Sequence, residues 1–201
     1  MVAKFFKQFQ KSPSVITIVS GLPRSGTSMM MKILEAGGME VFTDNLRIPD
    51  EDNPKGYFEL EQVKALKDGD DSWVKDAAGK VVKVISSLLE YLPSAYKYKI
   101  IFMRRAIPEI LASQKQMLIR RGEPSDGDDQ KMAEMFQEHL KRVRVWLANQ
   151  PNMETLYVDY NALMADPAPE IKNVAEFLGL NEKLDAMLAV PDKKLYRQKA
   201  S

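Results

Sequence analysis

Short apolar segments alternate along the chain with longer segments in which apolar residues recur every three or four positions. The short segments predict five strands, and the second of them is the weakest. They cover residues 15–20, 39–42, 81–85, 98–103 and 155–159. Nearly continuous apolar character, rich in β-branched and aromatic residues, is typical of parallel strands buried on both faces.

The periodic segments predict helices at residues 27–36, 108–121, 129–149 and 167–178. Asp166 and Pro167 form an N-cap followed by proline at the first helical position. Strands that alternate with helices favour an α/β fold, here a three-layer, P-loop-like domain with a central, mostly parallel β-sheet flanked by helices. Prolines, glycines and acidic residues predict loops at residues 44–57 and 121–129, which can shape an acceptor pocket.

The size and charge of the chain narrow its class. With 201 residues and 45% hydrophobic content, residues 1–201 are expected to form a single domain. The 29 Lys and Arg residues nearly balance the 28 Asp and Glu residues, so the bulk charge gives no support to nucleic-acid binding. Cysteine is absent, which excludes disulfides and thiolate metal sites. No apolar run has the length of a signal peptide or a membrane span, so we expect a cytoplasmic protein with no membrane partner.

Residues 15–28, VITIVSGLPRSGTS, combine an apolar strand, a glycine-bounded loop and the hydroxyl residues that open a helix. Backbone N–H groups of such a loop and the positive end of the helix dipole hold a multiply charged anion. ATP and GTP enzymes need a lysine after the second glycine, whereas here Gly26 is followed by Thr27. The pattern therefore argues against ordinary ATP hydrolysis or phosphoryl transfer.

A second pattern lies in residues 98–114, YKIIFMRRAIPEILASQ. A buried strand delivers Arg104 and Arg105 at its end, and the next helix presents Ser113 about two turns later. An arginine and a serine in this arrangement can converge on one phosphate. The sequence therefore contains two separate candidate anion sites.

These two segments resemble the sulfotransferases that use 3′-phosphoadenosine 5′-phosphosulfate (PAPS), in the bacterial branch of the P-loop sulfotransferase superfamily. Residues 23–28 resemble the family loop for the 5′-phosphosulfate, and Arg105 with Ser113 has the Arg-x7-Ser spacing of its 3′-phosphate segment. The resemblance implies that the loop residues bind the cosubstrate. They are Pro23, Arg24, Ser25, Gly26, Thr27 and Ser28.

Three further segments carry the resemblance. Residues 81–93 place Lys83 where the family has a lysine near the transferring sulfonate, although a lysine in a strand can also point outward at a sheet edge. Residues 156–167 place Tyr160 near the adenine, with a core aromatic as the alternative. The segment LYRQK implies that Arg197 and Lys199 add cations around the 3′-phosphate, unless they form a frayed tail.

The residue that would act as general base differs from the one in the phenol-type branch of this family. That branch has a histidine two residues after the strand lysine, but this position is Ile85, and the single histidine, His139, lies in the long predicted helix. Residues 50–61 resemble a stretch of bacterial members, and some branches use a glutamate as base. Glu59 is the candidate here, with Asp44 as the alternative.

The resemblance implies transfer of a sulfonate group from PAPS to a hydroxyl or amine of a small-molecule or carbohydrate acceptor, with release of adenosine 3′,5′-bisphosphate. Arg24 and Lys83 would supply fixed cations and Glu59 the base, and no metal is required. Two alternatives stay open at this point. One is a P-loop nucleotide or small-molecule kinase, and the other is a PAPS-binding protein without transfer activity.

Overall fold

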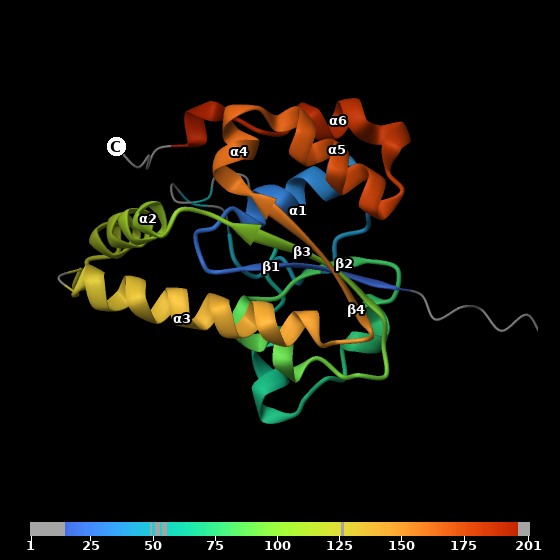
Figure 1. Cartoon of the computed structure of the whole chain (residues 1–201), viewed down its shortest axis with the longest axis horizontal. Helices are drawn as coiled ribbons and strands as arrows, with labels where there is room; N and C mark the ends of the chain where they lie inside the picture. Colours follow the sequence, from blue (N-terminus) through green and yellow to red (C-terminus); the bar gives the residue numbers. More distant parts are fainter. Residues whose placement is uncertain (1–14, 49, 51–52, 54–55, 126, 197–201) are drawn as a thin grey trace, which may run out of the picture.

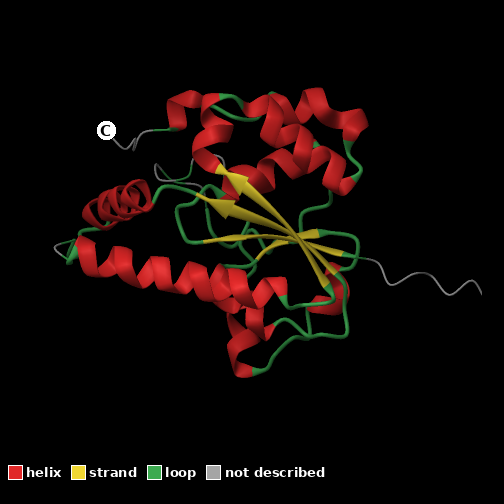
Figure 2. Ribbon diagram, viewed as in Figure 1, coloured by secondary structure: helices red, strands yellow, loops and turns green. Residues whose placement is uncertain are grey.

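The computed structural model describes residues 15–48, 50, 53, 56–125 and 127–196. Its centre is one sheet of parallel strands in the order β2-β1-β3-β4, flanked by helices (Figure 2). The strands are β1 (Ile16–Gly21), β2 (Val81–Lys83), β3 (Tyr98–Arg104) and β4 (Met153–Asp159). This arrangement confirms the predicted α/β fold.

Four of the five predicted strands are confirmed, and in three of them, β1, β2 and β3, every apolar residue is buried. All residues of β1 are buried, and β1 pairs in parallel with both β2 and β3. The prediction of a strand at residues 39–42 was wrong. In that segment a single residue, Val41, bridges to Val81, and the chain then leaves the sheet.

One face of the sheet packs against α1 and the C-terminal helices (Figure 1). Here buried methionine, leucine and valine side chains meet Val19, Ile101 and Met103. The helices on this side are α1 (Thr27–Ala36), α4 (Tyr160–Ala165), α5 (Pro167–Leu178) and α6 (Leu184–Leu188). The 3₁₀ turns η4 (Asn181–Lys183) and η5 (Lys193–Leu195) flank α6 along the chain.

The opposite face is covered by α3 and three 3₁₀ helices, around a core that includes Ile18, Trp73, Leu89 and Phe102. Figure 1 shows α3 crossing below the sheet, with α2 beside it at the end to which the strand arrows point. The elements are α2 (Ile107–Arg120), α3 (Asp129–Ala148), η1 (Glu61–Asp68), η2 (Val74–Ala77) and η3 (Ser86–Tyr91). Among the helices of the described ranges, none has the length and apolar character needed to cross a bilayer.

Capping residues set the helix ends as the sequence predicts. The Asp166 side chain accepts a hydrogen bond from Ala168 N at the start of α5, and Gly179 ends that helix with φ 74°.

His139 lies on α3, where its Nε2 is 2.8 Å from Ser86 Oγ. Burial lowers the pKa of this imidazole, and the nearby Arg142 adds to the shift.

The parallel order brings the carboxyl ends of all four strands to one edge of the sheet. The loop after β1, Lys83 at the end of β2, Arg105 after β3 and Tyr160 after β4 therefore lie in a row. In parallel α/β folds this edge is where ligands bind. The sheet thus gathers the residues that the sequence singles out.

Candidate functional site

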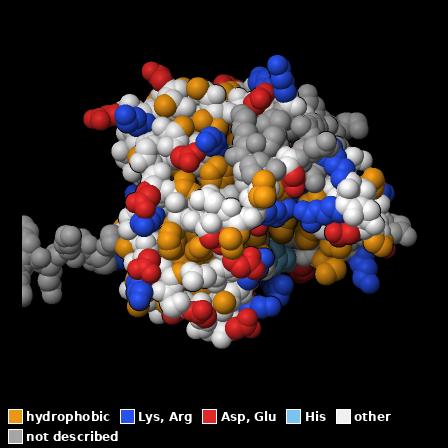
Figure 3. Space-filling model, turned by 180° about the vertical axis from the view of Figure 1, so that it is seen from behind, with side chains coloured by type: hydrophobic (Ala, Val, Ile, Leu, Met, Phe, Trp, Pro, Cys, Tyr) orange, Lys and Arg blue, Asp and Glu red, His pale blue; other side chains and the backbone are white. Residues whose placement is uncertain are grey.

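A cavity of about 480 Å³ opens at this edge. Its described lining carries far more positive than negative side chains, although the chain as a whole is nearly neutral. The cations are Arg24, Arg47, Lys64, Lys83, Arg105, Arg120 and Arg121, and the carboxylates are Glu59 and Asp192. Figure 3 shows Lys and Arg side chains gathered beside hydrophobic ones on one face of the molecule. This local charge favours an anionic ligand.

The loop between β1 and α1 forms one wall of the cavity, and its shape depends on glycine. At Gly26, φ is 95°, and an added Cβ would lie 2.4 Å from Cδ2 of Tyr160. At Gly21, an added Cβ would lie 2.7 Å from the backbone oxygen of Met103. Arg24 also adopts a positive φ, 70°, which is uncommon for a residue with a side chain. The loop leads directly into the N-terminus of α1, where backbone N–H groups favour an anion.

The two sequence patterns meet through Arg24. Its Nε donates a hydrogen bond of 2.9 Å to Ser113 Oγ, and its backbone oxygen accepts one of 3.0 Å from Arg105 Nη1. Ser113 is buried, with 6% of its surface exposed. The structure therefore brings Arg24, Arg105 and Ser113 together, although the sequence places Arg24 in one candidate anion site and Arg105 with Ser113 in the other.

Lys83 points into the cavity from the end of β2 and is 9% exposed. Its Nζ donates to Tyr57 O and lies 3.4 Å from both Ser28 Oγ and Glu59 Oε1. Burial lowers the pKa of Lys83 from 10.5 to about 8, while the Glu59 carboxylate opposes part of this shift. The ammonium is thus mostly charged at neutral pH and lies beside the loop.

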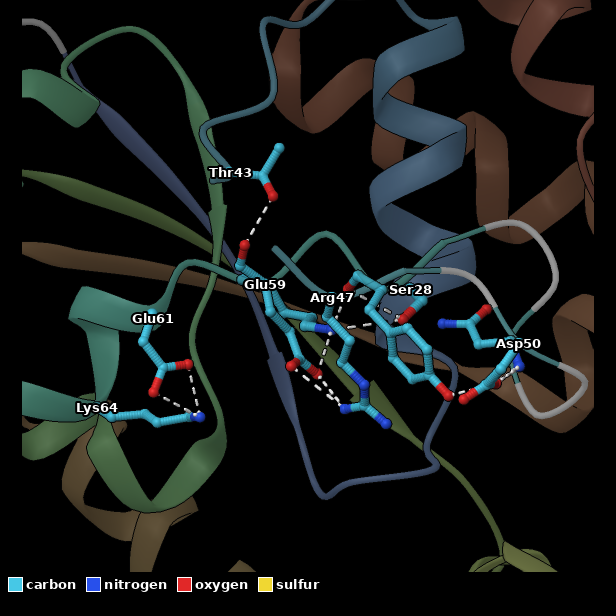
Figure 4. Close-up of polar contacts among 10 residues, drawn as sticks. Ser28, Thr43, Arg47, Asp50, Glu59, Glu61 and Lys64 are labelled. Atoms are coloured by element: carbon cyan, nitrogen blue, oxygen red, sulfur yellow. Dashed lines mark hydrogen bonds and ion pairs between the residues drawn. The ribbon is translucent and has the colours of Figure 1, made fainter. Parts of the chain in front are cut away.

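Glu59 lines the cavity and faces Arg47 (Figure 4). Its carboxylate accepts hydrogen bonds of 3.0 and 3.2 Å from Arg47 Nη1, in addition to its contact with Lys83. The Arg47 guanidinium also stacks on the Tyr57 ring, 3.4 Å from its centroid. Sequence reasoning missed Arg47 and Tyr57, because a stacked cation and ring leave no spacing signal in a loop.

Asp44, the alternative base, is not part of the described cavity lining. Its Oδ1 accepts a hydrogen bond from Leu46 N and its Oδ2 accepts one from Glu61 N, at 3.0 and 2.6 Å. These bonds fix the loop and the start of η1. Asp44 therefore has a clear structural role, whereas Glu59 faces the cavity.

Arg105 lies on the β3 side of the loop, over the ring of Tyr160, 4.4 Å from its centroid. Its Nε donates a hydrogen bond of 2.9 Å to Glu109 Oε2. In this ion pair the Arg105 side chain is 7% exposed and the Glu109 side chain is 2% exposed. Burial raises the pKa of Tyr160, so its hydroxyl stays protonated. Glu109 was missed by sequence reasoning, although its position four residues after Arg105 at a helix start was a usable signal. Arg197 and Lys199 lie outside the described residues.

The family model for sulfotransferases matches residues 57–183. The chain belongs to the sulfotransferase family. A comparison with curated proteins gave no match.

Two solved sulfotransferase structures share the fold. The sulfotransferase domain from the Synechococcus PCC 7002 olefin synthase is 19% identical, with a TM-score of 0.51, and the match covers 98% of this chain and 87% of that one. The sulfotransferase STF1 from Mycobacterium tuberculosis H37Rv is 18% identical, with a TM-score of 0.56, and the match covers 92% of this chain and 76% of that one. Both similarities support the α/β sulfotransferase fold for this chain.

Proposed function

We propose that this member of the sulfotransferase family transfers a sulfonate group from PAPS to a hydroxyl or amine of a small-molecule or carbohydrate acceptor, without a metal, in the cytoplasm. The observation that carries the proposal is the pair of cationic regions in one cavity. One lies at the loop and Lys83, and the other at Arg105 and Ser113. PAPS has anionic groups at both its 5′ and 3′ positions, so it needs two such regions.

The loop fits the 5′-phosphosulfate. Glycine at position 26 leaves the backbone open where a side chain would clash with Tyr160, and the α1 N-terminus adds a positive end. Thr27 and Ser28 line the same wall, and their hydroxyl groups can donate hydrogen bonds. Backbone N–H groups of residues 26–28, at the start of α1, can donate as well. Arg105 and Ser113 would hold the 3′-phosphate, and Tyr160 would contact the adenine.

The reaction requires an acceptor oxygen or nitrogen to attack the sulfur while the bond from sulfur to the bridging phosphate oxygen breaks. The electron pair of that bond stays on adenosine 3′,5′-bisphosphate. Lys83 and Arg24 would stabilise the charge on the bridging and equatorial oxygens. Glu59, which lies 3.4 Å from the Lys83 ammonium, would take up the proton that the attacking hydroxyl or amine loses. Its place in the cavity lining favours it over Asp44.

The decisive experiment compares the affinities of adenosine 3′,5′-bisphosphate and AMP, because they differ only in the 3′-phosphate. Wild-type protein should bind the bisphosphate at least about tenfold better, since a charged hydrogen-bonded pair contributes roughly 1.5 to 3 kcal/mol. Arg105→Ala should erase most of this preference.

Arg104→Ala is the matched control, because Arg104 is the exposed neighbouring arginine and contacts the Tyr157 ring instead. It should keep the preference for the bisphosphate. Equal affinity of the wild-type protein for the two nucleotides would refute the proposal. Magnesium-dependent ATP turnover would favour the kinase alternative, whereas sulfonate transfer should persist in EDTA.

A further inference from the structure

We propose that Glu109 is a positioning residue that joins the C-terminal segment at Tyr196 to Arg105, so that docking of Tyr196 and binding of a nucleotide 3′-phosphate stabilise each other. This inference rests on the proposed function, because it takes Arg105 as the 3′-phosphate ligand. The inference assigns roles to two residues that the proposed function does not use, and these lie on different elements. Glu109 is in the first turn of α2, and Tyr196 follows η5.

The Glu109 carboxylate is 2% exposed and lies at the centre of a partly buried hydrogen-bond network. Its Oε2 accepts from Arg105 Nε at 2.9 Å, and its Oε1 accepts from Asn161 Nδ2 at 2.8 Å and from Tyr196 OH at 2.7 Å. A buried carboxylate is costly unless donors surround it. Each donor to Glu109 therefore helps to hold the carboxylate that orients Arg105.

Asn161 holds the Glu109 carboxylate from a second side of the network. Its Oδ1 accepts from Ala106 N, which directly precedes α2, while its Nδ2 donates to Glu109. The amide thus links the start of α4 to the start of α2. Because the carboxylate is fixed by Asn161 and Tyr196 together, a loss of either donor loosens the Arg105 guanidinium.

The aromatic rings give Tyr196 a second contact with the same arginine. Tyr196 meets Tyr160 edge to face, with 5.5 Å between ring centroids and 86° between planes. The Arg105 guanidinium lies 4.4 Å from the Tyr160 centroid and 5.6 Å from the Tyr196 centroid. A guanidinium held between two rings and a carboxylate is already oriented, so it loses less conformational freedom when it binds a phosphate.

The coupling is reciprocal, because two events that stabilise the same arrangement must favour each other equally. Tyr196 should raise the affinity for a nucleotide that has a 3′-phosphate. That nucleotide should in turn hold the segment that contains Tyr196. Lys193 and Lys194 lie in this segment and are exposed, so trypsin can report on its docking.

The test uses Tyr196→Phe, which removes the hydroxyl and keeps the ring. Affinity for adenosine 3′,5′-bisphosphate should fall by about fivefold or more, within the usual range of coupling between linked sites, and affinity for AMP should change less than about twofold. Tyr91→Phe is the matched control, because Tyr91 lies on η3 with 45% of its surface exposed. It should leave both affinities unchanged.

A second measurement follows trypsin cleavage after Lys194 in the full chain. Adenosine 3′,5′-bisphosphate should slow this cleavage in the wild-type protein, AMP should not, and Tyr196→Phe should lose the difference. A fall in both nucleotide affinities alike would assign Tyr196 a merely structural role and overturn the inference. If the wild-type protein prefers the bisphosphate and Tyr196→Phe keeps that full preference, this inference fails while the proposed function stands. If the wild-type protein has no preference, the proposed function itself fails.

Discussion

Replacing Lys83 with methionine should stabilise the protein while removing its activity. Methionine has a similar length and no charge to bury. The wild-type lysine has its pKa lowered from 10.5 to about 8, mainly by burial, and at 1.36 kcal/mol per unit this corresponds to about 3 kcal/mol. The variant also loses the hydrogen bond from Lys83 to Tyr57 O, which offsets about 1 kcal/mol of this gain in stability. The expected gain in the free energy of unfolding at pH 7 is therefore about 2 kcal/mol.

The partners of Lys83 do not lose all their contacts in this variant. Tyr57 O still accepts from Ser28 Oγ, at 3.4 Å, and Glu59 keeps its ion pair with Arg47. Glu59 is also one-third exposed, at 33% of its side chain, so water can solvate it. Turnover should nevertheless fall by roughly 10²- to 10³-fold, as expected when one stabilising donor is removed from a reacting group.

The gain in stability should depend on pH. Between about pH 8 and 10.5 the unfolded chain keeps a proton on Lys83 that the native protein has lost, so wild-type stability rises with pH in this window. The advantage of Lys83→Met is therefore full below about pH 8 and should nearly vanish by about pH 10.

Urea denaturation at pH 7 and pH 10 measures this change, with turnover assayed beside it. Lys67→Met, an exposed lysine on η1, is the matched control and should change neither quantity. A variant less stable than the wild-type protein at pH 7, or a gain that is the same at both pH values, would refute the reasoning. Either result would mean that the contacts of Lys83 outweigh the cost of burying its charge.

Three further outcomes are expected. Glu59→Gln should lower kcat by roughly 10²- to 10⁴-fold with nucleotide affinity nearly unchanged, whereas Asp44→Asn should mainly lower stability in urea titrations. Near-normal turnover in Glu59→Gln would exclude it as the base. Gly26→Ala should weaken nucleotide binding in calorimetry, because its Cβ would meet the Tyr160 ring at 2.4 Å. The kcat/KM profile should fall above about pH 8 as Lys83 loses its proton, and Lys83→Arg should extend the active range to higher pH.

The sequence predicted the parts of this fold that depend on local pattern. The loop after β1, the continuous burial of β1, the burial of the apolar residues of β3 and the caps of α5 all follow from residue types at fixed spacings. The segment at residues 39–42 failed because its apolar character serves packing, and just one residue of it bridges to the sheet. The 3₁₀ helices η1–η3 are short, so their periodicity is too weak to read.

The candidate site shows the same division. Arg105 and Ser113 belong to one pattern within a single segment, so the sequence could pair them in advance. Arg24 belongs to another segment, and its contact with Ser113 is visible only in the structure. Glu109 and Tyr196 are 87 residues apart, and their contact depends on how α2 and the C-terminal segment fold together. A glutamate in a first helical turn usually faces water, so the spacing of Glu109 from Arg105 indicates an ion pair but does not indicate that Glu109 is 2% exposed.

The order of the strands also fixes the separation between two cationic residues of the candidate site. β2 and β3 flank β1, and adjacent strands are about 4.8 Å apart, so the residues that end β2 and follow β3 emerge roughly 10 Å from each other. Lys83 and Arg105 are those residues. Backbone hydrogen bonds of the sheet maintain this span between the two backbone positions. Under the proposed function, the separation between the two anionic ends of the donor would therefore contribute to its selection.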